Sequence, residues 1–215
     1  MTFTRAIGLA CNKIIVLIVR GLALSKIHPN VLTFFGLLIN IVAAVLLATG
    51  QFRTAGLVIV GAGLFDMVDG RVARETNQVT RFGGFFDSVL DRYSDLALLM
   101  GLLVYYGNIN RPFYVVLTAL VMTGSVMVSY TRARAENTIP TCKVGFMERP
   151  ERVVLLIIGA LFDRMAPALW VLAVLANLTV LHRMIFTWQE TKRLEEAQLE
   201  LAPGDSKKTI AGRQH

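Results

Sequence analysis

Cysteine is nearly absent from this sequence of 215 residues, and charged side chains are few. The two cysteines, Cys11 and Cys142, lie far apart, and both fall on segments assigned below to the cytoplasmic side of a membrane, which argues against a structural disulfide. Charged residues make up 17% of the chain against 54% hydrophobic residues, and the mean hydropathy is +0.57. Several apolar runs approach the roughly 20 residues needed to cross a bilayer. The composition therefore indicates an integral membrane protein.

The excess of basic residues gives the chain a formal net charge of +7. A basic balance can indicate nucleic-acid binding, but Lys and Arg beside membrane spans more often report topology or contact with anionic lipid. We therefore expect the basic residues to interact with the lipid bilayer, and we expect no nucleic acid as a partner.

Apolar runs separated by turn residues predict an all-α fold with six transmembrane helices in one domain. The segment His28-Pro29-Asn30 interrupts the helix before the first apolar run, and Gly50 to Arg53 form a short turn after that run. The fifth helix is short, and we expect it to begin earlier than its apolar part, near Glu148. The predicted six-helix core covers 28–190, with helices at about 31–49, 54–74, 83–106, 111–135, 152–162 and 167–188.

Both ends of the chain differ from this core. Residues 1–27 carry Arg5, Lys13, Arg20 and Lys26 at intervals through apolar sequence, which predicts an amphipathic juxtamembrane helix on the membrane surface. A signal peptide is the alternative, but Arg20 interrupts the apolar stretch. After Lys192, which ends the membrane domain at 1–192, we expect a helical extension and a polar, disordered cytoplasmic tail within 193–215.

The distribution of Lys and Arg predicts the orientation, because cytoplasmic loops carry the excess of positive charge. If both termini, the 71–92 turn and the 132–152 loop face the cytoplasm, only Arg53, Arg111 and Arg164 of the 22 Lys and Arg lie on the opposite side. We therefore expect a multi-pass protein of the cell (inner) membrane with both termini in the cytoplasm.

Four aspartates stand inside otherwise apolar segments, where an unpaired charge is costly. Asp66 and Asp69 are three residues apart and Asp87 and Asp91 four apart, so each pair shares one face of a helix. The stretch between the pairs contains glycine and polar residues, which suit a turn between two antiparallel helices. Four carboxylates that converge without His or Cys suit Mg²⁺ or Mn²⁺, and two such ions could handle a phosphoryl group.

Other interpretations of these aspartates remain open at this point. A single pair could form a structural ion pair with Arg71 or Arg74, or the carboxylates could form the permeation site of a divalent-cation transporter. A prenyl transferase would also use aspartate-rich helices, but nothing after Asp95 supplies a second aspartate-rich motif.

The pattern Asp66-x2-Asp69-Gly70-x2-Ala73-Arg74-x8-Gly83-x3-Asp87-x3-Asp91 resembles, at every fixed position, the signature of the CDP-alcohol phosphotransferases. These are integral membrane enzymes of phospholipid synthesis, and their six-helix layout is similar to the one predicted above. The resemblance covers about 28–190.

The resemblance implies roles for individual residues. Two Mg²⁺ or Mn²⁺ ions would be held by the four aspartates, and Asp91 would also act as the general base. The CDP-lipid would be bound by residues on both sides of the first aspartates: Pro29, Asn30, Thr33, Gly70, Ala73, Arg74, Thr80 and Gly83. The family also implies a homodimer.

The acceptor alcohol depends on residues outside this signature. Ser129-Tyr130-x-Arg132-x-Arg134-Ala135-Glu136, followed by Glu148-Arg149-x-Glu151-Arg152, places many cations beside the predicted site, and Arg183 adds another inside an apolar segment. Such a cluster suits an acceptor that itself bears phosphate, although topology alone would also place basic residues here.

This arrangement resembles the phosphatidylinositol phosphate synthases and the archaetidylinositol phosphate synthases, which often have Lys at the position of Arg132. The resemblance implies that CDP-diacylglycerol is the donor, inositol phosphate the acceptor and CMP the leaving product. Glycerol phosphate as acceptor, as in phosphatidylglycerophosphate synthases, and an archaetidyl donor are the alternatives. The acceptor phosphate would then contact Ser129, Arg132, Arg152 and Arg183. Asp95, four residues after Asp91, could be a further site residue or could pair with Arg92 or Tyr130, and it is left unassigned.

Overall fold

The computed structural model describes residues 29–75 and 80–201, with side chains at 30–66 and 80–197. These residues form α-helices and loops without any strand in the described ranges, so the predicted all-α class is confirmed for this part of the chain. The helices are α2 (Pro29–Ala48), α3 (Phe52–Glu75), α4 (Arg81–Asn108), α5 (Pro112–Ala135), α6 (Arg149–Leu161) and α7 (Met165–Leu201). The predicted juxtamembrane helix at 1–27 and the end of the tail lie outside the described residues.

Three of the described helices are long and apolar enough to cross a membrane by length and composition. They cover Asn30–Ala48, Pro112–Ala135 and Met165–Ala197. α3 and α4 carry the aspartates, and α6 has only 13 residues. The three apolar helices indicate a membrane protein.

Local sequence sets the helix boundaries. Gly50, Asn110 and Asp163 adopt positive φ in the short turns after α2, α4 and α6, where glycine, asparagine and aspartate are the residues that tolerate this conformation. Thr80 caps α4, because its hydroxyl accepts a hydrogen bond of 2.9 Å from the amide of Gly83. The polar extension of α7 continues as helix to Leu201, as predicted.

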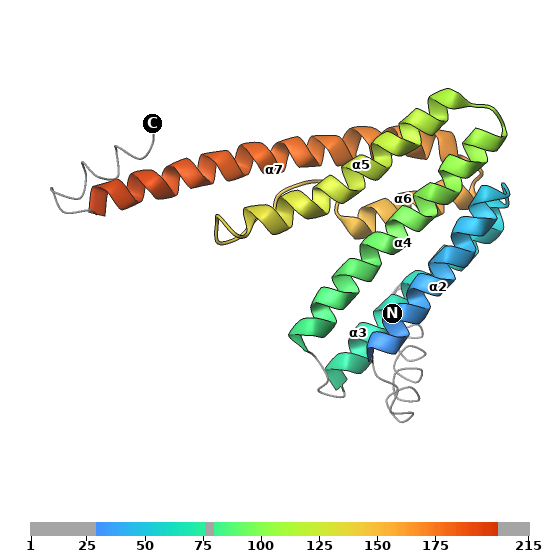
Figure 1. Cartoon of the computed structure of the whole chain (residues 1–215), viewed down its shortest axis with the longest axis horizontal. Helices are drawn as coiled ribbons and strands as arrows, with labels where there is room; N and C mark the ends of the chain where they lie inside the picture. Colours follow the sequence, from blue (N-terminus) through green and yellow to red (C-terminus); the bar gives the residue numbers. More distant parts are fainter. Residues whose placement is uncertain (1–28, 76–79, 202–215) are drawn as a thin grey trace, which may run out of the picture.

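The helices form two groups (Figure 1). α2 packs against both α3 and α4, whereas α5 packs along α7. The groups meet where α4 contacts α5 and where the short α6 lies between α3 and α7. One apolar core of buried residues from all six helices, including Leu47, Ile59, Leu98, Leu156 and Leu172, holds the two groups together.

Gly101 allows a close approach of α2 and α4. A Cβ atom at this position would lie 2.2 Å from the carbonyl oxygen of Ala44 and 2.9 Å from its carbonyl carbon. Backbone atoms cannot move aside as a side-chain tip can, so this contact fixes how α4, and with it the second aspartate pair, packs on α2.

We predict that Gly101→Ala destabilises the protein by about 3 kcal/mol, because the added methyl group must push two packed helices apart. In thermal unfolding in detergent, this corresponds to a midpoint lower by roughly 10 °C for a chain of this size. Gly107→Ala in the same helix is the matched control, since a Cβ there meets nothing within 4 Å. Equal midpoints for the two variants would contradict the close packing described here.

Candidate active site

Arg149 contacts one aspartate from each of the two predicted pairs. Its Nη2 lies 3.1 Å from Oδ2 of Asp66 on α3, and its Nη1 lies 2.9 Å from Oδ1 of Asp91 on α4. The two carboxylates therefore come from different helices and face a single cation. This convergence is the arrangement that the sequence pattern predicts.

The other two aspartates are less fully defined. Asp87 lies near enough to Asp66 and Asp91 to interact with both electrostatically. The side chain of Asp69 is outside the described residues, although its backbone continues α3 one turn beyond Asp66. The structure thus brings Asp66 and Asp91 to one guanidinium, with Asp87 close enough to interact electrostatically.

The donor set suits a hard divalent cation, because it consists of carboxylate oxygens. Among the side chains that the structure describes, no three acidic, imidazole or thiol groups are arranged so that they could hold an ion as they stand. The guanidinium of Arg149 occupies the position between Asp66 and Asp91, and it marks a place where two helices already present oxygen atoms to one cation. Mg²⁺ or Mn²⁺ would be held by these two aspartates together with Asp87 and Asp69.

Gly36 on α2 leaves room for this site. A Cβ atom there would lie 2.8 Å from Oδ1 of Asp66, so any larger residue would press on the carboxylate. The sequence pattern does not identify Gly36, since it lies 30 positions before Asp66 in an apolar run.

Residues from the predicted CDP-lipid site gather at the beginnings of α2 and α4. A Cβ at Gly83 would lie 3.0 Å from the Thr80 hydroxyl and 3.3 Å from the Asn30 side-chain oxygen. The structure therefore places these three predicted residues side by side, and Thr33 is buried one turn further along α2. For Pro29, Gly70, Ala73 and Arg74 the described part of the chain includes only the backbone.

Two of the predicted acceptor-binding residues share one carboxylate. Arg132 on α5 and Arg183 on α7 each donate to the same Oε1 of Glu148 at 3.1 Å, and Arg132 also pairs with Glu136. Arg183 is 1% exposed and further donates to the carbonyl oxygens of Val144, at 2.8 Å, and Val128. Arg183 thus connects α7 to α5 and to the loop before α6, whereas Arg132 is partly exposed. Ser129 is half-buried one turn before Arg132.

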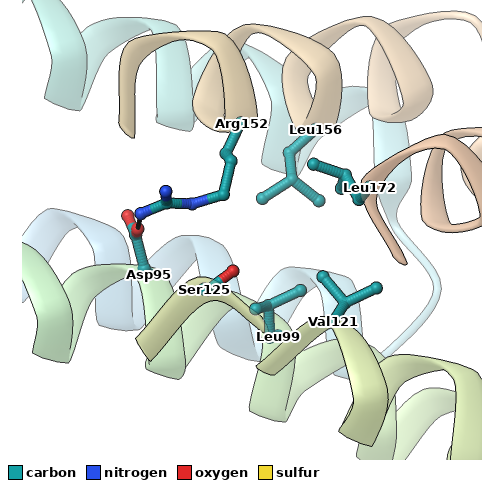
Figure 2. Close-up of a pocket in the computed structure, with 7 residues that line it drawn as sticks. All are labelled: Asp95, Leu99, Val121, Ser125, Arg152, Leu156 and Leu172. Carbon is teal, nitrogen blue, oxygen red and sulfur yellow. Dashed lines mark hydrogen bonds and ion pairs between the residues drawn. The ribbon is translucent and has the colours of Figure 1, made fainter. Parts of the chain in front are cut away.

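Arg152 points inward from α6 and meets Asp95 of α4 (Figure 2). Nη2 of Arg152 lies 2.7 Å from Oδ2 of Asp95, and its Nη1 donates to the carbonyl oxygen of Met147. The pair borders a cavity of about 10 Å³ whose other walls are mostly apolar. They come from α4, α5, α6 and α7: Leu99, Val121, Ser125, Leu156 and Leu172.

Asp95 also lies 3.5 Å from Nε of Arg149, so this aspartate contacts both arginines of α6. Arg92, one of the partners considered from sequence, instead donates to the Ser88 carbonyl within its own helix. Besides Gly36, the sequence pattern also assigns no role to Asp95 and Arg149. Their spacing does offer a signal, since Asp95 is one turn beyond Asp91 on the same helical face.

A larger cavity of about 410 Å³ lies between α5 and α7. Its walls include Arg134, Arg183 and Trp188, together with several threonines, and no carboxylate contributes to them. The described lining of this cavity thus presents hydroxyl groups and two arginines.

Asp66 and Asp91, from two helices, thus face one guanidinium, and further arginines lie beside them. The profile of the family described as CDP-alcohol phosphatidyltransferase matches residues 26–189, which is most of the chain. The chain belongs to this family, and it is therefore a membrane-associated transferase.

Characterised relatives indicate a narrower group within the family. The chain is 36% identical to the archaetidylinositol phosphate synthase of Pyrococcus horikoshii, over 82% of this chain and 90% of the relative. It is also 36% identical to the phosphatidylinositol phosphate synthase of Mycobacterium bovis, over 80% of this chain and 84% of the relative.

Solved structures of the same group of enzymes are also similar to this chain. The Mycobacterium tuberculosis phosphatidylinositol phosphate synthase with CDP-DAG bound superposes with a TM-score of 0.77 at 32% identity, covering 82% of this chain and 94% of that one. The same enzyme in complex with manganese and citrate gives a TM-score of 0.75 at 33% identity, covering 81% and 88%.

Proposed function

We propose that this protein transfers a phosphatidyl group from CDP-diacylglycerol to inositol phosphate, giving phosphatidylinositol phosphate and CMP. The observation that carries the proposal is the convergence of Asp66 and Asp91 from two helices on one cation, beside a cluster of arginines. The names of the relatives support the acceptor, since both groups of synthases act to form inositol phosphate lipids.

The donor's diphosphate requires positive charge. Two Mg²⁺ or Mn²⁺ ions on Asp66, Asp69, Asp87 and Asp91 would offset the charge of the diphosphate and of the departing CMP. The manganese complex of the mycobacterial enzyme supports this choice of metal. Asn30, Thr80 and Gly83 would contact the CDP group, as would Pro29, Thr33, Gly70 and Ala73, and Arg74 can bind phosphate oxygens in a bidentate way.

The reaction needs one proton acceptor. As the acceptor hydroxyl oxygen attacks the phosphorus that carries the lipid, the new P–O bond forms and the bond from that phosphorus to CMP breaks. Asp91 would take the hydroxyl proton, so no covalent enzyme intermediate is required. Arg132, with Ser129 beside it, is exposed enough to meet the acceptor phosphate directly. Arg152 and Arg183, which are buried and already paired, would add positive charge on the protein side of the acceptor phosphate.

The membrane arrangement is part of the same proposal. The protein would lie in the cell (inner) membrane, and all six described helices would cross the bilayer. The 1–27 segment would lie on the membrane surface, and both termini would face the cytoplasm. The protein would act as a homodimer, as family resemblance implies.

The donor could instead be an archaetidyl lipid, because two of the matched relatives are archaetidylinositol phosphate synthases. The two donors share the CDP group and differ in their chains. The acceptor is the same in both cases.

We predict that purified protein with Mg²⁺ or Mn²⁺ releases CMP from CDP-diacylglycerol at least about tenfold faster with inositol phosphate than with glycerol phosphate, serine or free inositol, because an arginine cluster favours a phosphorylated acceptor. CMP release is followed for each acceptor, with ester and ether donors compared in parallel. Glycerol phosphate as the best acceptor would identify a phosphatidylglycerophosphate synthase. Metal flux into proteoliposomes without CMP release would favour a divalent-cation transporter.

A further inference from the structure

Arg149 is the first residue of α6, and its guanidinium lies among carboxylates from two other helices. It is 3.1 Å from Asp66, 2.9 Å from Asp91 and 3.5 Å from Asp95, measured between the nearest nitrogen and oxygen atoms. Two of these aspartates are proposed metal ligands, and the third is not. The side chain of Arg149 keeps 29% exposure, so it has room to move.

The same carboxylates cannot serve a guanidinium and a divalent ion equally well. An oxygen that accepts a charge-assisted hydrogen bond from Arg149 offers less electron density to a metal. A cation within a few ångströms of the ion also raises the free energy of metal binding by direct repulsion, which is strong in a partly buried site. Arg149 must therefore leave Asp66 and Asp91, at least in part, when both bind metal.

Asp95 provides a place for the displaced guanidinium. Its carboxylate is 9% exposed, lies one turn beyond Asp91 on α4, and already faces Nε of Arg149. Because Asp95 also holds Arg152 at 2.7 Å, it stays fixed whichever partner Arg149 adopts. Asp95 therefore offers Arg149 a carboxylate partner that is not one of the proposed metal ligands.

We propose that Arg149 is an internal counter-ion that competes with divalent cations for Asp66 and Asp91, and that metal binding shifts its guanidinium toward Asp95. The competition neutralises the buried carboxylates when metal is scarce and lowers the apparent metal affinity. This inference rests on the metal assignment made under the proposed function, and it assigns Arg149 a positioning role at that site.

The experiment titrates Mn²⁺ into chelator-treated protein in detergent, without lipid or nucleotide, and follows free Mn²⁺ by electron paramagnetic resonance. Arg149→Gln removes the competing charge and should lower the Kd for Mn²⁺ roughly tenfold, within the usual range of coupling between sites. Arg149→Lys keeps the charge but cannot bridge two carboxylates with a planar fork, so its Kd should fall roughly threefold. Arg134→Gln, which removes an exposed cation of α5, is the matched control and should leave the Kd unchanged.

The outcomes separate this inference from the proposed function. An unchanged or higher Kd in Arg149→Gln would overturn the competition, as would a Kd for Arg149→Lys equal to that of the wild type, which would indicate a diffuse field effect. If Arg149→Gln does not fold, the lysine variant decides alone. Absence of saturable Mn²⁺ binding in the wild type would reject the metal site and this inference together. Normal Mn²⁺ competition without CMP release under any acceptor would reject only the proposed function.

Discussion

Asp91→Asn should reduce CMP release by about a thousandfold or more while the protein stays folded. Asparagine has nearly the shape of aspartate but cannot take a proton at neutral pH, so it removes the general base, which alone contributes about 10²–10⁴-fold. It also removes one charged oxygen ligand from the proposed metal pair. The side chain is 17% exposed and points to Arg149 and not into the apolar core, so the helix packing should survive.

The measurement compares CMP release under saturating donor and acceptor, together with binding of CDP-diacylglycerol and the thermal unfolding midpoint. Donor binding should weaken far less than turnover, because the proposed CDP contacts at Asn30, Thr80 and Gly83 remain. Asp163→Asn is the control, since it makes the same chemical change in an exposed turn at positive φ, where asparagine is tolerated. Turnover within tenfold of the wild type would reject Asp91 as the base.

The helices could be predicted from sequence because long apolar runs separated by Gly, Pro and Asn leave few alternatives. The predicted helix at 31–49 corresponds to Pro29–Ala48, and the short fifth helix begins at Arg149, directly after Glu148 as expected. Packing could not be predicted in the same way. The contact of Gly101 with the Ala44 backbone depends on how two helices cross, and no local pattern encodes that crossing.

The candidate site likewise has a part that could be predicted from sequence and a part that could not. The aspartates could be found because four carboxylates in apolar sequence require an explanation, and their spacing places each pair on one helical face. The ion pairs could not, because Arg149 and Asp66 are 83 positions apart and Arg152 and Asp95 are 57 apart. Only the folded chain shows that α6 supplies cations to α3 and α4.

The loop before α6 links these cations to the rest of the protein. The amides of Phe146 and Met147 both donate to the buried hydroxyl of Thr179 on α7, and Gly145 adopts a φ of 123° beside it. A Cβ at Gly145 would lie 2.5 Å from the Thr179 methyl carbon, so glycine is needed there on both grounds. The loop is therefore held firmly, and it sets the position from which Arg149 and Arg152 reach the aspartates.

Asp95→Asn should both destabilise the protein and weaken its interaction with the acceptor. Arg152 is 3% exposed, and loss of its carboxylate partner leaves a buried charge unpaired, which costs about 3–5 kcal/mol. The thermal midpoint should fall by roughly 10 °C. The acceptor KM should rise about tenfold while the donor KM changes little, because the arginines of α6 lose their shared anchor and the proposed CDP contacts lie elsewhere.

A double variant separates stability from function at this pair. Asp95→Leu combined with Arg152→Met replaces the ions by apolar groups of similar volume, and buried pairs replaced in this way often lose no stability. The surrounding Leu99, Val121, Leu156 and Leu172 can accept such groups. We expect the thermal midpoint to return to within a few degrees of the wild-type value, because the unpaired buried charge is gone. The acceptor KM should stay high. If the acceptor KM also returned to the wild-type value, Arg152 and Asp95 would be structural only, and acceptor recognition would depend on Arg132 and its neighbours.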